Sequence, residues 1–220
     1  MSLGYKSVLS TAMCYLYLVS MGASVHAQEA PSLYVPDKTI VALLPIVDLS
    51  GVTDKSTKAG VSALAREALL HQFTDRGFKY VSNSKISDAA KRLNIDITDP
   101  EQQKRSVLLQ LGKETGADLV CLVVITDVAR NNQSTGIIGI TFATVKSKCW
   151  LLDVKTSRAL LSAKIVAGNT ERYSPYSTAP QSEASASAAE QSIINAFKPV
   201  FKDYPTLKQK PKTEDSEAHE

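Results

Sequence analysis

The sequence contains few of the residues that build catalytic centres and metal sites. There are three cysteines and three histidines in 220 residues, and between residues 28 and 203 only Cys121, Cys149 and His71 remain. A zinc site usually takes four ligands, and a serine or cysteine nucleophile needs a base within hydrogen-bond reach. His71 lies inside a helical pattern, where a structural histidine is the favoured interpretation. We therefore predict no catalytic residues, no metal site and no cofactor.

Glycine is scarce where a phosphate-binding loop would need it. The turn after the first predicted strand, 39–47, offers Gly51 alone, whereas the known phosphate-binding loops use several glycines. Asp48, at the end of that strand, is interpreted as a turn-forming or helix-capping residue rather than a metal ligand. Charge of one sign is not in large excess either, because the formal net charge is +3. We expect neither a nucleotide nor a nucleic acid as a ligand.

The first 27 residues have the composition of a cleavable secretory signal peptide. Lys6 is the only charged residue among them, and it precedes an apolar stretch over residues 8–19. This stretch is shorter than the roughly 20 apolar residues of a transmembrane helix, although an uncleaved anchor helix is the alternative. Val25 and Ala27 occupy the positions that a signal peptidase reads, which predicts cleavage between Ala27 and Gln28.

Cys14 invites comparison with the lipidated cysteine of a lipoprotein. Met13, which precedes it, is bulky where a lipidation site needs a small residue, and no apolar region remains upstream of it. We therefore expect no lipid anchor. After cleavage, residues 28–37 are predicted to be a linker.

Hydrophobic periodicity predicts a single α/β domain over residues 38–203, followed by a disordered tail over 204–220. The expected sheet is mixed, with about five strands, a parallel first part and an antiparallel three-strand meander at the end, flanked by helices. The predicted strands are 39–47, 78–82, 118–128, 139–153 and 159–167. The predicted helices are 57–76, 85–93, 99–115 and one that begins near 183.

Cys121 and Cys149 fall in neighbouring predicted strands. If the hairpin turns within 132–136, they lie almost opposite each other, and either a disulfide or two buried thiols would fit. The polar stretch 131–136 is interpreted as a hairpin loop, with a recognition loop as the alternative. Trp150, Tyr173 and Tyr176 could form a sugar-stacking or partner-binding surface, although a lone Trp in a strand is more often a core residue, as we predict for Trp150.

Three short motifs carry a resemblance to a family. IVALLP at Ile40–Pro45 leads into DLSG at Asp48–Gly51, GADLV at Gly116–Val120 opens a strand, and LDVKT at Leu152–Thr156 forms a hairpin. In this order they resemble the superfamily of the curli secretion channel CsgG, the amino-terminal domain of TolB, and the lipoprotein activators of penicillin-binding proteins. The resemblance covers roughly residues 38–200.

The resemblance implies a mixed-sheet α/β domain that binds envelope proteins and has no catalytic residues to transfer. The chain departs from the curli channel in two respects: it lacks an acylated cysteine at the mature amino terminus, and its loop near Asn132 is short for a membrane-inserted hairpin. Ser157 also stands where the family usually has glycine, so it must adopt a conformation that glycine tolerates better.

We therefore expect a non-enzymatic, periplasmic protein-binding or assembly module of the bacterial cell envelope, soluble or peripheral to the outer membrane. The expected partner is an envelope protein of unknown identity, and self-association is left open. Two alternatives remain: a component of an outer-membrane secretion complex resembling the curli channel, and a secreted enzyme or small-ligand binder whose site is built from distant residues.

Overall fold

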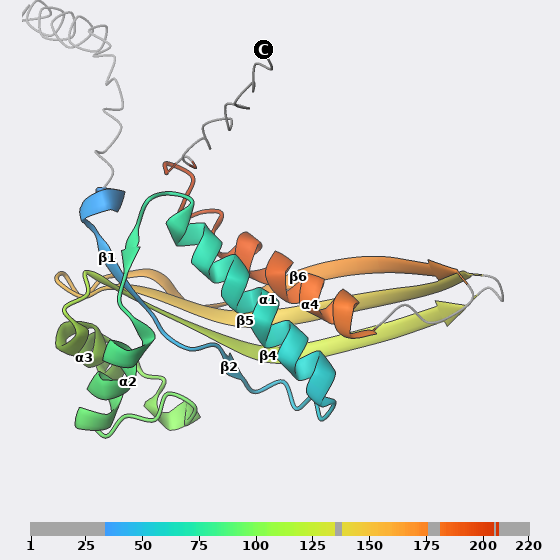
Figure 1. Ribbon diagram of the computed structural model, residues 1–220, viewed down its shortest axis with the longest axis horizontal. Helices are drawn as coiled ribbons and strands as arrows, with labels where there is room; N and C mark the ends of the chain where they lie inside the picture. Colours follow the sequence, from blue (N-terminus) through green and yellow to red (C-terminus); the bar gives the residue numbers. More distant parts are fainter. Residues whose placement is uncertain (1–33, 135–137, 176–180, 205, 207–220) are drawn as a thin grey trace, which may run out of the picture. The chain divides into compact units, whose positions relative to one another are not determined.

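The computed structural model describes residues 34–134, 138–175, 181–204 and 206. In this part of the chain one mixed sheet has the strand order β3-β1-β4-β5-β6, and a sixth strand, β2, also pairs with β4. Figure 1 shows helices on both faces of this sheet. The predicted α/β class, with a parallel first part and an antiparallel meander, is confirmed.

The parallel part of the sheet is built from short strands. These are β1 (Ile40–Leu43), β2 (Val47–Asp48) and β3 (Lys79–Tyr80). The single strand predicted over 39–47 is therefore two strands, with Pro45 between them. Proline has no backbone N–H to donate to a ladder, so the pairing with β4 is interrupted there and resumes at Val47.

The meander is longer than predicted. It consists of β4 (Leu119–Ser134), β5 (Ile138–Asp153) and β6 (Ala159–Pro175), so each strand spans about 50 Å at roughly 3.3 Å per residue. The polar stretch 131–134, predicted to be a loop, pairs with 139–142 of β5. The hairpin near Asn132 is therefore extended, contrary to our expectation of a short one. Residues 135–137, between β4 and β5, lie outside the described residues.

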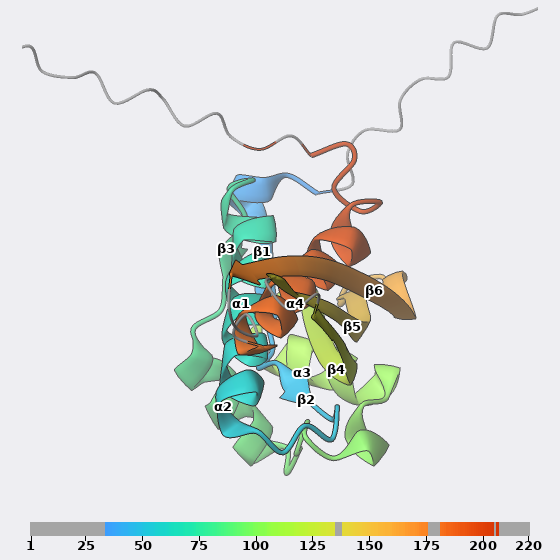
Figure 2. The same ribbon diagram turned by 90° about the vertical axis from the view of Figure 1, so that its right-hand side faces the viewer.

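Two helices cover one face of the meander. Figures 1 and 2 show α1 (Lys55–Thr74) and α4 (Gln181–Phe197) lying side by side over β4, β5 and β6. Asp54 caps α1 by accepting from the Thr57 amide. The shared core of this layer holds Val61, Leu69, Phe73, Cys121, Val123, Val145, Leu151, Ile193 and Phe197. The apolar face predicted for the last helix, which includes Ile193 and Phe197, is thus confirmed.

Among the described residues, the other face of the sheet is covered only at the start of β4 and the end of β5. There α2 (Asn83–Arg92) and α3 (Arg105–Thr115) pack with Val120, Leu122, Trp150 and Leu152, which makes Trp150 a core residue as predicted. The helix predicted from Asp99 begins instead as a separate 3₁₀ turn, η2 (Pro100–Gln102). In Figure 1 the meander extends to the right well past α2 and α3.

Aromatic side chains tie the two ends of the described chain together. The rings of Phe73, Phe78, Phe197 and Phe201 lie 5.1–5.9 Å apart in edge-to-face, tilted and stacked arrangements. The Tyr34 amide donates to the Tyr204 hydroxyl. Tyr34 precedes a 3₁₀ turn, η1 (Pro36–Lys38), which lies within the segment predicted as a linker.

Candidate protein-binding surface

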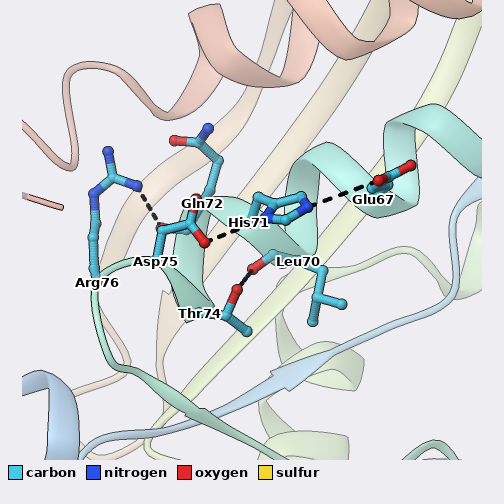
Figure 3. A network of polar contacts seen from close by, with 7 residues as sticks. All are labelled: Glu67, Leu70, His71, Gln72, Thr74, Asp75 and Arg76. Carbon is cyan, nitrogen blue, oxygen red and sulfur yellow. Dashed lines mark hydrogen bonds and ion pairs between the residues drawn. The ribbon is translucent and has the colours of Figure 1, made fainter. Parts of the chain in front are cut away.

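His71, the histidine considered as a catalytic base, is a surface residue of α1. Its ring nitrogens lie 3.2 Å from Asp75 Oδ1 and 3.8 Å from Glu67 Oε1. Figure 3 shows the two carboxylates on either side of the ring. The hydrogen bond that His71 donates to Asp75 raises the pKa of His71 above its ordinary value, and the charges of both carboxylates act in the same direction. The imidazole therefore has the surroundings of a helix ion pair at positions i−4 and i+4.

A shallow furrow of about 200 Å³ runs beside His71 between α1 and α4. Its apolar floor includes Leu64 and Ile194, and Glu67 and Glu190 stand on its two sides. None of its lining residues is a serine, threonine or cysteine. Within the described ranges, no group of three or more His, Cys, Asp or Glu residues could hold a metal ion.

Asp48 forms a turn, as its sequence position indicates. Its Oδ1 atom accepts hydrogen bonds from the Ser50 amide at 2.9 Å and from the Ser50 hydroxyl at 2.6 Å. This is the Asx-type geometry that fixes a turn two residues further on. Gly51, which follows, has a φ of 74°.

Cys121 and Cys149 are free thiols, both fully buried beneath the helices. Cys121 lies opposite Leu151 and Cys149 lies opposite Val123, so the cysteines are diagonal neighbours rather than nearly opposite as expected. The Cα atoms of diagonal pairs lie about 7–8 Å apart, beyond the usual reach of a disulfide. Burial raises the pKa of Cys149 to about 12 and also raises that of Cys121.

In the half of the meander that is farther from α2 and α3, one face is not covered by any described residue. In β5 the residues Ala143, Val145 and Ser147 are buried under α1 and α4, so the intervening residues point to the opposite side. On that side, past α2 and α3, the ladder registers place three rows of residues. They are Asp127, Ala129 and Asn131 of β4, Phe142, Thr144, Lys146 and Lys148 of β5, and Ile165, Ala167, Asn169, Glu171 and Tyr173 of β6.

The outermost strand of this face, β6, carries exposed apolar side chains. Ile165 is 59% exposed and Tyr173 is 63% exposed, the two largest values among the exposed large hydrophobic residues of the described chain. β6 ends the strand order, so one of its edges has no neighbouring strand within the described residues. Sequence analysis had singled out Tyr173 but not Ile165, because the predicted strand gave no sign of which face would be left uncovered.

Comparisons with known proteins show likeness in structure only. No family model and no curated protein sequence matches the chain. The LpoB carboxy-terminal domain from Salmonella enterica matches with 14% identity over 63% of this chain and 86% of that one, at a TM-score of 0.41. Lipoprotein GNA1162 from Neisseria meningitidis matches with 18% identity over 71% and 99%, also at 0.41. The PelC dodecamer from Paraburkholderia phytofirmans matches with 13% identity over 75% and 90%, at 0.34.

The structural neighbours are thus LpoB, a penicillin-binding-protein activator lipoprotein, and related envelope lipoproteins. At these identities and TM-scores they assign neither an activity nor a partner to this chain. The resemblance to the curli channel and to TolB stays a prediction.

Our expectation of no lipid anchor is wrong as judged by these matches, because LpoB and GNA1162 are lipoproteins, which carry such anchors. That expectation rested on Met13 as a poor neighbour for a lipidated Cys14. Both residues lie outside the described residues, so no geometry of this segment supports it. The predicted cleavage site at Ala27 and Gln28 also lies outside them, as does the tail beyond residue 206.

Proposed function

We propose that this chain is a non-enzymatic protein-binding module of the bacterial cell envelope, located in the periplasm or at the periplasmic side of a membrane. Its binding surface is the uncovered distal face of β4, β5 and β6. The LpoB-like proteins that it is similar to are regulatory lipoproteins and not enzymes. In the described part of the chain, no helix has both the length and the apolar character needed to cross a membrane.

One observation carries the proposal: two large apolar side chains on an uncovered sheet face are more than half exposed. Single exposed hydrophobic residues are common, but Ile165 and Tyr173 share one strand, and the half-buried Phe142 lies on the same face in the neighbouring strand β5. Aromatic and aliphatic side chains surrounded by polar ones are typical of a binding surface. Here Lys146, Asn169 and Glu171 supply the polar surroundings.

Site-specific photo-crosslinking in cells tests this surface. A photoreactive phenylalanine analogue at position 173 should capture one defined envelope protein. The same analogue at Tyr80 is the matched control, because Tyr80 is 53% exposed but lies on β3, at the opposite end of the strand order. The purified captured protein should bind the purified chain, and Ile165→Lys should weaken binding at least about 10-fold. Equal capture from both positions, or none from 173, would contradict the proposal.

Export by an amino-terminal signal peptide is part of the proposal, and the intact mass of the protein recovered from the envelope identifies its processing site. A chain that begins at Gln28 would place the cleavage after Ala27. A chain that begins at an acylated Cys14 would identify a lipoprotein and move the processing site. A mass that includes Met1 would exclude cleavage altogether.

A further inference from the structure

The free edge of β6 is a long row of backbone donors and acceptors. In an antiparallel ladder, alternate residues of an edge strand point their N–H and C=O groups away from the sheet. Proteins usually interrupt such edges with bulges, prolines or covering segments. Here the irregularity lies at Ala163, where φ is 51°, and the proline is the final residue, Pro175. Between them, the ladder with β5 continues without a break from Lys164 to Pro175.

One side chain already touches this edge strand. Asn195 of α4 donates through Nδ2 to the Ala167 carbonyl oxygen at 3.1 Å, and Gln191 holds Asn195 from the preceding turn. Asn195 thus already satisfies the Ala167 carbonyl, so an added strand would replace this one bond and pair with the remaining outward-facing groups. An added strand would supply such donors at every second residue.

We propose that the β6 edge from Lys164 to Tyr173 accepts an extended segment of a partner envelope protein as an additional strand of the sheet. This inference rests on the proposed protein-binding function and names its mode of recognition. Main-chain hydrogen bonds supply affinity in this mode, and side chains on alternate positions supply specificity.

The position of α4 favours an extended segment over a second copy of this chain. Gly168 of β6 lies so close to α4 that a Cβ on it would meet the Ala188 carbonyl oxygen, so α4 lies directly over the edge strand. Two copies that paired β6 with β6 would have strands about 4.8 Å apart. Each would then bring its own α4 over the same place, whereas packed helices need about 8–10 Å between their axes. An extended segment that carries no helix needs no such space.

The side chains along the edge define the chemistry of the segment. Ile165 and Tyr173 leave apolar contacts at the two ends of the stretch. Lys148 lies opposite Ile165 on β5, and Lys164 is the preceding residue, so this end is cationic. At the other end Glu171 is the acidic side chain on the uncovered face, whereas Arg172 lies on the helix-covered face and donates to the Ser187 hydroxyl. The fitting segment is therefore about ten residues long, with alternating apolar side chains, an acidic residue near Ile165 and a basic residue near Glu171.

The probe for this inference is a phage-displayed library of random decapeptides, panned against the purified protein. The enriched peptides should show the alternating pattern with opposite charges at their two ends. Ile165→Lys and Glu171→Lys should each weaken binding of the best peptide about 10-fold or more. Tyr80→Ser, which removes an exposed aromatic residue from β3, should leave that binding unchanged.

Residue-resolved amide hydrogen exchange then identifies strand addition. On binding, exchange should slow at least about 10-fold at every second amide between 164 and 173, while the amides bonded to β5 keep their rates. Protection of the α1 and α4 helices instead, or no enriched peptide, would overturn the inference. The inference would also be overturned if the same amides exchanged slowly in the free protein and lost this protection when residues 207–220 were deleted. In that case residues 207–220 would occupy the edge. In each of these cases photo-crosslinking from position 173 could still succeed, which separates this inference from the proposed function.

Discussion

Gly168 of β6 lies directly beneath Ala188 of α4. A Cβ built on Gly168 would stand 2.1 Å from the Ala188 carbonyl oxygen and 2.2 Å from the Ser192 amide nitrogen. Both are backbone atoms of a helix, so neither can move aside without displacing the helix. Glycine at this position therefore allows α4 to approach the sheet closely.

Gly168→Ala is expected to lower the free energy of unfolding by roughly 2 kcal/mol or more, because α4 must shift away from β6. Gly60→Ala is the matched control. Gly60 lies within α1, and its Cβ would meet the Ala186 Cβ at an ordinary 3.6 Å. That change should stabilise the protein by about 0.5–1 kcal/mol, since alanine is the better helix former. Urea unfolding of both variants measures the difference, and equal effects would contradict the close packing.

The hydrogen bond between Tyr34 and Asp153 should make stability depend on pH in the acid range. The Tyr34 hydroxyl donates to Asp153 Oδ2 at 2.6 Å. Burial alone would raise the pKa of Asp153, but hydrogen bonds from the Thr156 amide and from Tyr34 outweigh it and hold the pKa below 3.8. The folded state thus favours the carboxylate, so this stabilisation is present above the unfolded pKa and is lost as the pH falls through the folded pKa.

Tyr34→Phe should therefore reduce the free energy of unfolding by about 1–2 kcal/mol at pH 7, where the acceptor is charged. The difference from the unsubstituted protein should shrink as the pH falls through the folded pKa of Asp153. Tyr80→Phe, at an exposed tyrosine, should change little at either pH. Urea unfolding at pH 7 and pH 2.5 gives both values, and a Tyr34→Phe effect independent of pH would argue against the assignment to Asp153.

His71 should contribute stability only when it is protonated. Asp75 and Glu67 on α1 face it, and Glu190 of α4 lines the same furrow. Because these contacts raise the folded pKa above 6.5, the contribution is fully present below the unfolded pKa and is lost as the pH rises through the folded pKa. His71→Gln should cost about 0.5 kcal/mol or less at pH 5.5, given the exposure of these groups, and nothing at pH 9. An NMR titration with a pKa at or below 6.5 would contradict this.

Cys121 and Cys149 should resist thiol reagents in the folded protein. Both are fully buried, and their pKa values are raised, so little reactive thiolate forms near neutral pH. In urea without reductant, a maleimide reagent should label both cysteines of the mature chain, which mass spectrometry would count. If the cysteines are not labelled in urea alone but are labelled after reductant is added, they form a disulfide. Cys121→Ser should lower stability through a buried hydroxyl without a matching partner.

The sequence was sufficient for the order and type of the main elements. Continuous apolar runs such as 119–125 identify central strands, and the periodicity of 183–197 identifies the last helix. The sequence also predicted correctly that glycines end two of the helices. Gly77 and Gly116 adopt φ values of 84° and 67° at helix ends, and Ser157 adopts 57° at the turn where glycine is usual in the resembling family.

The sequence was not sufficient for the length of the meander. Residues 131–134 are polar and 168–169 are Gly-Asn, which local propensity assigns to loops. They remain in strands because each pairs with β5, and Gly168 is required by the packing of α4. The cysteine register follows from the position of the hairpin, because the pairing of Ser134 with Gly139 places the turn later in the chain than the predicted 132–136.

The sequence could not predict the uncovered face of the meander, for a related reason. Whether Ile165 is buried depends on how far α2 and α3 extend along the sheet, and those helices come from a different part of the chain. A strand with alternating residues has the same pattern whether or not a second layer covers its outer side. The free edge of β6 likewise follows from strand order, which single-sequence periodicity does not contain.

The packing of α1 against α4 determines when, during synthesis or export, this protein can complete its folding. α1 and α4 pack side by side although about a hundred residues separate them in the chain. The apolar surface of the meander is only partly covered until residues 181–197 have joined it, so a chain still being synthesised or threaded through a translocation pore leaves the rest of that surface in water. Such distant contacts slow folding and prolong the exposure of strand edges. We therefore expect the domain to complete its folding only after α4 has emerged.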